Sequence, residues 1–126
     1  MNTQTLIITE KPSVARAIAS SLGANVRGDG CIHGNNLIVS WCCGHLVELA
    51  TPAAYDERLA KWRREDLPIL PGPWKTSVMR DKRAQFEILR GLMQRGDVGE
   101  VVNACDAGRE GELIFRLVYE KAGCDK

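Results

Sequence analysis

Two short apolar runs in this sequence each end in a carboxylate. Residues 6–9 lead into Glu10, and residues 101–105 lead into Asp106; Glu110 then lies in the first turn of a predicted helix. If both runs are buried parallel strands, their carboxyl ends meet at one edge of a sheet, where open α/β sheets place their sites. Carboxylate oxygens gathered there suit Mg²⁺, so the pattern favours phosphate chemistry.

Two cations stand beside these acids. Lys11 follows Glu10, and Arg109 precedes Glu110. Repulsion among clustered carboxylates raises the pKa of at least one of them, which can then transfer a proton, and the interleaved cations suit a phosphodiester. A structural alternative stays open, because acids are common at helix starts, where they complement the helix dipole. On that interpretation Asp106 and its neighbours form only a turn and a cap.

The remaining pattern predicts an α/β sheet with a parallel centre. We expect strands at 5–9, 31–33, 37–43, 75–79 and 100–105, and helices at 12–22, 53–60, 82–95 and 110–122. Gly34-Asn35-Asn36 predicts a hairpin turn, and Asp81 is the expected cap of the third helix. The residues expected to face inward are Val14, Ala17, Ile18 and Leu22, then Phe86, Ile88, Leu89, Leu92 and Met93, and finally Leu113, Ile114, Leu117 and Val118.

Size and composition indicate one ordinary globular domain. The chain has 126 residues and a net charge of +1, with no apolar run near the roughly 20 residues of a membrane span and no signal peptide. Its five cysteines form no C-x-x-C pair, which disfavours zinc and disulfide frameworks and favours reduced thiols in the cytosol. Cys105 suits a packed strand better than the role of a nucleophile.

Residues 51–74 form an expected insertion within a domain that spans 1–126. This segment holds four of the five prolines, and we expect Leu67, Ile69, Leu70 and Trp74 to pack it against the domain. The chain stops after a helix, where a further strand would be natural, so we expect it to be the N-terminal part of a longer protein. The basic residues are interspersed with acids, which favours a solvated surface over a DNA-facing patch; they are Arg58, Lys61, Arg63, Arg64, Arg80, Lys82 and Arg83.

Three motifs together resemble a known family. They are Glu10-Lys11-Pro12-Ser13, Gly44-His45-Leu46 and Asp106-x-Gly-Arg109-Glu110-Gly111-Glu112. In this order and spacing they resemble the N-terminal TOPRIM domain of type IA DNA topoisomerases, most of all the bacterial topoisomerase III group. The likeness covers essentially the whole chain and implies the Rossmann-like TOPRIM fold, a mainly parallel sheet flanked by helices.

The resemblance also implies an activity and its site. Enzymes of this family cut one DNA strand through a 5′-phosphotyrosyl link, pass another strand and reseal the cut without ATP. By motif, Glu10 would handle the proton of the leaving 3′-oxygen and, with Asp106 and Glu110, bind Mg²⁺. Lys11 and Arg109 would steady the scissile phosphate. The implied partners are single-stranded DNA and the remaining topoisomerase domains, with no membrane, in the bacterial cytoplasm at the nucleoid.

The sequence departs from the family pattern in two places. The usual signature is Asp-x-Asp-x-Glu, but the middle position here is Gly108. Glu112 is a weak candidate for the missing ligand, because on a helix it faces Arg116. The catalytic tyrosine of the family lies beyond this domain, and neither Tyr55 nor Tyr119 matches it, so residues 1–126 alone should not cleave DNA. The role of His45 stays open between structural and functional.

Two other kinds of protein remain possible. One is a TOPRIM enzyme of the primase or nuclease kind, against which the Gly44-His45 step argues. The other is a non-catalytic phosphate- or partner-binding α/β module whose acids are structural.

Overall fold

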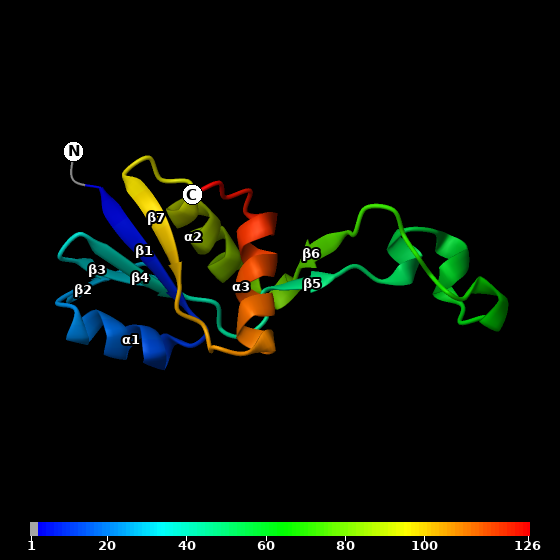
Figure 1. Ribbon diagram of the computed structural model, residues 1–126, viewed down its shortest axis with the longest axis horizontal. Coiled ribbons are helices and arrows are strands. Elements are labelled where there is room, and N and C mark those ends of the chain that lie inside the picture. Colours follow the sequence, from blue (N-terminus) through cyan, green and yellow to red (C-terminus); the bar gives the residue numbers. More distant parts are fainter. Residues whose placement is uncertain (1–2) are drawn as a thin grey trace.

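The computed structural model describes residues 3–126. A five-stranded mixed sheet, in the order β2-β3-β4-β1-β7, forms the middle layer of the body of the fold (Figure 1). β1 pairs in parallel with β4 and β7, while β3 pairs antiparallel with β4 and β2. The strands are β1 (Gln4–Thr9), β2 (Val26–Gly28), β3 (Cys31–Gly34), β4 (Leu37–Trp41), β5 (Val47–Leu49), β6 (Thr76–Val78) and β7 (Val98–Asn103); the helices are α1 (Pro12–Ser21), α2 (Arg83–Met93) and α3 (Arg109–Lys121).

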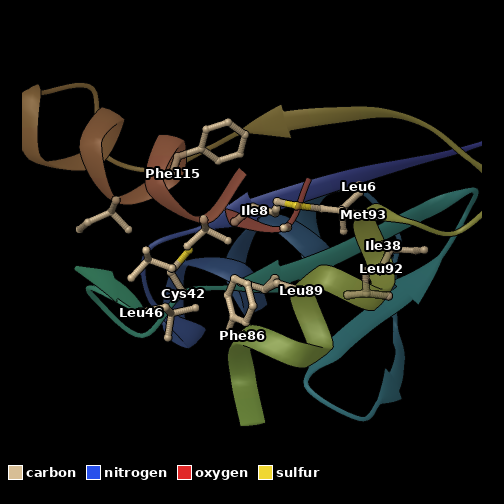
Figure 2. Packing of buried hydrophobic residues seen from close by; sticks show 14 of the residues in the cluster. Leu6, Ile8, Ile38, Cys42, Leu46, Phe86, Leu89, Leu92, Met93 and Phe115 are labelled. Atoms are coloured by element: carbon tan, nitrogen blue, oxygen red, sulfur yellow. The ribbon is translucent and has the colours of Figure 1, made fainter. Parts of the chain in front are cut away.

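Helices cover both faces of this sheet. α1 packs on one face against Ile7 and Val39, and α2 and α3 pack on the other. In Figure 2 the side chains of α2 and Phe115 of α3 lie over Leu6 and Ile8 of the central strand, both of which are fully buried. Each such side chain contributes about 1.5–3 kcal/mol when buried. The α/β architecture with a parallel centre is therefore confirmed. No helix in the described part of the chain is long and apolar enough to cross a membrane.

The predicted hairpin and the α2 stripe are confirmed. Asn35 and Asn36 both have positive φ, +53° and +61°, as a two-residue turn between β3 and β4 requires. In α2 the buried residues are Phe86, Leu89, Leu92 and Met93. The prediction of Asp81 as the N-cap of α2 is wrong. Asp81 belongs to a 3₁₀ turn, and Lys82 occupies the N-cap without a side-chain hydrogen bond.

The predicted inward face of α1 is confirmed at Ile18, which packs against the core, and wrong at Val14, Ala17 and Leu22. Ala15 and Ala19 are its buried residues, whereas Val14 and Leu22 are 39% and 44% exposed. Apolar residues occur on two adjacent faces of this helix, and the alanine face allows the closer approach to the sheet. In α3, similarly, Phe115 is buried and Leu113 is exposed.

β7 is an edge strand rather than a strand buried on both faces. It pairs with β1 and ends the strand order, and Val102 is 39% exposed. β2 was not predicted, because its three exposed residues carry no apolar pattern.

Residues 50–75, here called the arm, extend away from the body beyond the β5–β6 ribbon (Figure 1). The predicted strand at 75–79 is present as β6, but it pairs with β5 outside the main sheet. In place of one helix at 53–60 there are separate 3₁₀ turns at Pro52–Ala54 and Glu57–Ala60. The expected packing of the arm is wrong, because it extends off the body and no layer of the fold covers it; Leu67, Leu70 and Trp74 are exposed.

The carboxylate of Asp97, the residue before β7, links the start of that strand to the start of β1. Asp97 accepts hydrogen bonds from Arg95 (2.7 and 2.9 Å) and from the Gln4 amide (2.7 Å). These bonds, that from Arg95 first, lower the pKa of Asp97 to about 2. A carboxylate whose folded-state pKa is depressed stabilises the fold above its unfolded pKa, and that contribution is lost as the pH falls through the folded value.

We therefore predict that Asp97→Asn lowers the free energy of unfolding at pH 7, and that its difference from wild type shrinks as the pH falls from about 4 towards about 2. Urea unfolding across that range measures the difference. Asp125→Asn, at an exposed position near the C-terminus, is the matched control. A deficit that is the same at every pH would contradict the assigned role of the Asp97 charge.

Candidate active site

The two predicted acids meet at one edge of the sheet. Glu10 follows the last residue of β1, and Asp106 lies in the turn after its parallel neighbour β7. Both line an open cavity of about 670 Å³, whose other residues are Gly108, Arg109, Glu110, Gly111 and Leu113. Burial, hydrogen bonding to Asp106 and repulsion by its charge raise the pKa of Glu10, and the nearby Lys11 charge opposes them. Glu10 and Asp106, which the sequence predicts at two neighbouring strand ends, therefore lie at the same cavity.

Backbone and hydroxyl bonds hold Glu10 in place. The buried Thr9 hydroxyl donates to the Lys11 carbonyl at 2.9 Å, which fixes the turn into α1. The Gly44 N–H donates to the Glu10 carbonyl at 3.2 Å. Gly44 has a φ of +77°, a conformation that favours glycine. The Gly44-His45 step is therefore in direct contact with the strand end that carries Glu10.

A glycine fixes the position of Asp106. A Cβ on Gly111 would lie 2.0 Å from the Asp106 carbonyl oxygen, so the first turn of α3 rests directly on the Asp106 backbone. By contrast, a Cβ on Gly108 would meet no atom within 4 Å, and Gly108 has an extended φ of −139°. Sequence reasoning missed the requirement at Gly111, whose only signal was a second glycine within the Gly-Arg-Glu-Gly motif.

The capping alternative for these acids is not supported. Gly108 is the N-cap of α3, and no side chain makes a capping hydrogen bond there. Asp106 contributes only its carbonyl, which accepts from the Gly108 N–H at 2.8 Å. Its carboxylate is left facing the cavity.

His45 contacts the third acid. Its Nε2 is hydrogen-bonded to the Glu110 carboxylate, and both side chains are partly exposed. This contact joins residues 65 positions apart, which the sequence pattern could not reveal. Glu110 therefore lines the cavity beside Glu10 and Asp106 but is bonded to an imidazole.

The donor chemistry of the cavity fits a hard cation. Within residues 3–126 no three His, Cys, Asp or Glu side chains stand close enough together to form a preassembled metal cluster. The cavity lining nevertheless supplies three carboxylates and neither thiol nor imidazole, which is the donor type of Mg²⁺ rather than of Zn²⁺. Glu10, Asp106 and Glu110 are the residues present that could hold such an ion.

The neighbouring charges divide between the cavity and the surface. Arg109 lines the cavity, and Lys11, at the N-cap of α1, is exposed beside Glu10. Glu112 is engaged elsewhere, because one of its oxygens accepts from Arg116 at 2.7 Å and the other from Asn103 at 3.0 Å. The predicted pairing of Glu112 with Arg116 is confirmed.

The thiols near the site are packed rather than open. All five cysteines are free. Cys105, beside Asp106, is half-buried with its Sγ 3.8 Å from the Ile8 carbonyl. Hydrogen bonding to Cys105 and burial raise the pKa of the Cys42 thiol. These surroundings agree with a packing role for both residues.

Comparison with known proteins agrees with this arrangement. The Toprim domain family matches residues 5–126. DNA topoisomerase 3 of Staphylococcus aureus strain USA300 is 46% identical over 123 residues, which cover 98% of this chain and 17% of that protein. Putative DNA topoisomerase 3 of the bovine strain RF122 is 47% identical over 121 residues, 96% of this chain and 17% of the relative. The chain thus spans about a sixth of the length of these relatives. With a match that runs from the first strand to the last residue, the chain belongs to the Toprim domain family.

Proposed function

We propose that this chain is the catalytic Toprim domain of a type IA, topoisomerase III-like DNA topoisomerase and acts within a longer polypeptide. The convergence of Glu10, Asp106 and Glu110 on one cavity supports this most directly. The length and names of the relatives support it further. On this proposal residues 1–126 are the domain, 51–74 are an insertion in it, and the protein acts on nucleoid DNA in the cytoplasm.

We infer that Glu10, Asp106 and Glu110 are the residues that bind Mg²⁺. When bound, the ion would supply neutralising charge at the scissile phosphodiester. His45 would hold Glu110 at the cavity and offset part of its charge until the cation binds. Lys11 and Arg109 would hold non-bridging phosphate oxygens of a single DNA strand.

In the cleavage step, Glu10 is the proposed proton carrier. A tyrosine from another part of the polypeptide gives up its phenolic proton to water, attacks phosphorus and forms a 5′-phosphotyrosyl bond, while the bond to the 3′-oxygen breaks. Glu10 gives that oxygen a proton, and in resealing it takes the proton back as the 3′-hydroxyl attacks. The crowding of Glu10 against Asp106 is what suits it to this exchange.

We predict that Glu10→Gln in the full-length protein lowers the rate of supercoil relaxation by about 100-fold or more, the usual contribution of a positioned acid or base. Binding of a single-stranded oligonucleotide should stay near the wild-type level. Glu87→Gln, on the exposed side of α2, is the matched control. Relaxation by the Glu10 variant at the wild-type rate would overturn the assignment.

Mg²⁺ titration followed by NMR tests the metal site without any activity readout. We expect shifts localised at Glu10, Asp106 and Glu110. Asp106→Asn removes a charged ligand and should weaken the response by about tenfold. No localised shift at several millimolar Mg²⁺, or an unchanged affinity in the Asp106→Asn variant, would contradict the proposed ligands.

A carboxylate placed at position 108 should strengthen this site. Gly108 lines the cavity with open space around its Cβ position, so Gly108→Asp adds a fourth acid without a clash. We predict a Mg²⁺ affinity higher by about tenfold, measured by the same titration. Gly72→Asp, in the arm and equally open, adds the same charge far from the site. If both variants bind alike, the gain is only a net-charge effect.

A further inference from the structure

Within residues 3–126, the arm carries the most exposed of the large apolar side chains. Trp62 is 98% exposed and Leu70 79%, and Leu67 and Trp74 are each about two-thirds exposed. Figure 1 shows why, because the arm stands clear of the body that could have covered them. Large apolar side chains gathered on one exposed segment usually mark a binding site.

Two of these side chains, Trp62 and Leu67, border a hollow of about 420 Å³. Its apolar lining comes from Pro52, Leu59, Trp62, Leu67 and Ile69, and the basic residues Lys61, Arg63 and Arg64 stand around them. Exposed tryptophan and arginine residues beside an aliphatic pocket are typical of the centre of a protein–protein interface.

Asp66 adds a polar requirement to the same hollow. Its Oδ2 is buried and, within residues 3–126, is the one buried side-chain oxygen or nitrogen without a hydrogen-bond partner. Leaving such a group unpaired destabilises the fold. A partner that brings a donor to Asp66 while covering Trp62 would satisfy both features.

The charge of the arm disfavours nucleic acid as the occupant. Residues 50–75 hold five bases and four acids, so the net charge of the arm is only +1. A surface that binds DNA through its phosphates carries a clear excess of Lys and Arg. Arg58 is also paired with Asp56 at 3.2 Å. Although Lys61, Arg63 and Arg64 line the hollow together with Asp66, the small net charge of the arm and its apolar area fit a polypeptide instead.

The root of the arm lies at the cavity edge of the sheet. β5 begins two residues after His45, which bonds Glu110. The Met79 N–H donates to the Leu46 carbonyl at 2.8 Å, and Lys121 of α3 donates to the Thr76 carbonyl at 2.9 Å. The root of the arm is therefore tied to the segment that carries His45 and to the C-terminal end of α3.

We propose that the hollow of the arm is the docking site for another domain of the same polypeptide, which inserts an apolar side chain beside Trp62 and gives Asp66 a hydrogen-bond donor. This inference rests on the proposed function, in which a tyrosine must arrive from outside residues 1–126. The relatives, about six times longer than this chain, carry ample polypeptide for that role. The arm would then fix where the tyrosine-bearing part stands relative to Glu10.

Hydrogen exchange measured by mass spectrometry tests this in the full-length polypeptide. Peptides covering residues 57–70 should exchange at least about tenfold more slowly there than in the 126-residue chain, as expected for amides in a docked segment. Trp62→Ser, at a position that contributes nothing to the core, should restore fast exchange and lower the relaxation rate. Val26→Ser, half-exposed on β2 at the far end of the sheet, is the matched control and should change neither.

The outcomes separate this inference from the proposed function. Glu10-dependent relaxation with an unprotected arm would overturn the docking site and leave the function standing. A protected arm without relaxation would overturn the function alone. Protection of the arm in the 126-residue chain by a single-stranded oligonucleotide, or by raising the concentration of the chain itself, would overturn docking in favour of a nucleic-acid surface or a second copy.

Discussion

β1 pairs in parallel with β7, and every part of the candidate site takes its position from that pairing. The pairing runs from Gln4 to Ile8 on β1 and from Val98 to Asn103 on β7. Both strands therefore end at the same edge of the sheet. Because side chains alternate between faces, a slip of one residue in β1 would exchange Leu6 and Ile8, which pack against α2 and α3, for Ile7, which packs against α1. The fully buried Leu6 and Ile8 fix the register of β1, and through it the place of Glu10.

The site concentrates negative charge that the fold must tolerate without a cation. Three local features reduce the repulsion. Glu10 has a raised pKa beside Asp106, Glu110 is bonded to His45, and Arg109 lines the same cavity. Gly108 carries no charge, whereas a fourth acid at this position would add to the repulsion. An added acid would thus favour cation binding but would destabilise the fold in the absence of a cation.

The sequence predicted those parts of the structure that short-range patterns determine. The apolar run of β1, the Asn35-Asn36 turn and the stripe of α2 depend on neighbouring residues, and the convergence of Glu10 and Asp106 followed from two strand ends. Predictions failed where a distant partner decides. The inward face of α1 depends on which of two apolar faces fits the sheet, and the exposure of the arm depends on the absence of a covering layer. The His45–Glu110 contact needs the fold itself.

The contact between Gly111 and the Asp106 carbonyl has a consequence for comparing related sequences. Acids at a cavity surface can be exchanged without disturbing a backbone, so their loss in a relative says only that chemistry has changed. A glycine with no room for a Cβ is different, because its replacement means that the first turn of the helix has moved. A relative that keeps this glycine but not the acids retains the backbone geometry of the site without its chemistry. A relative that keeps the acids but not the glycine has lost the backbone geometry that positions those acids.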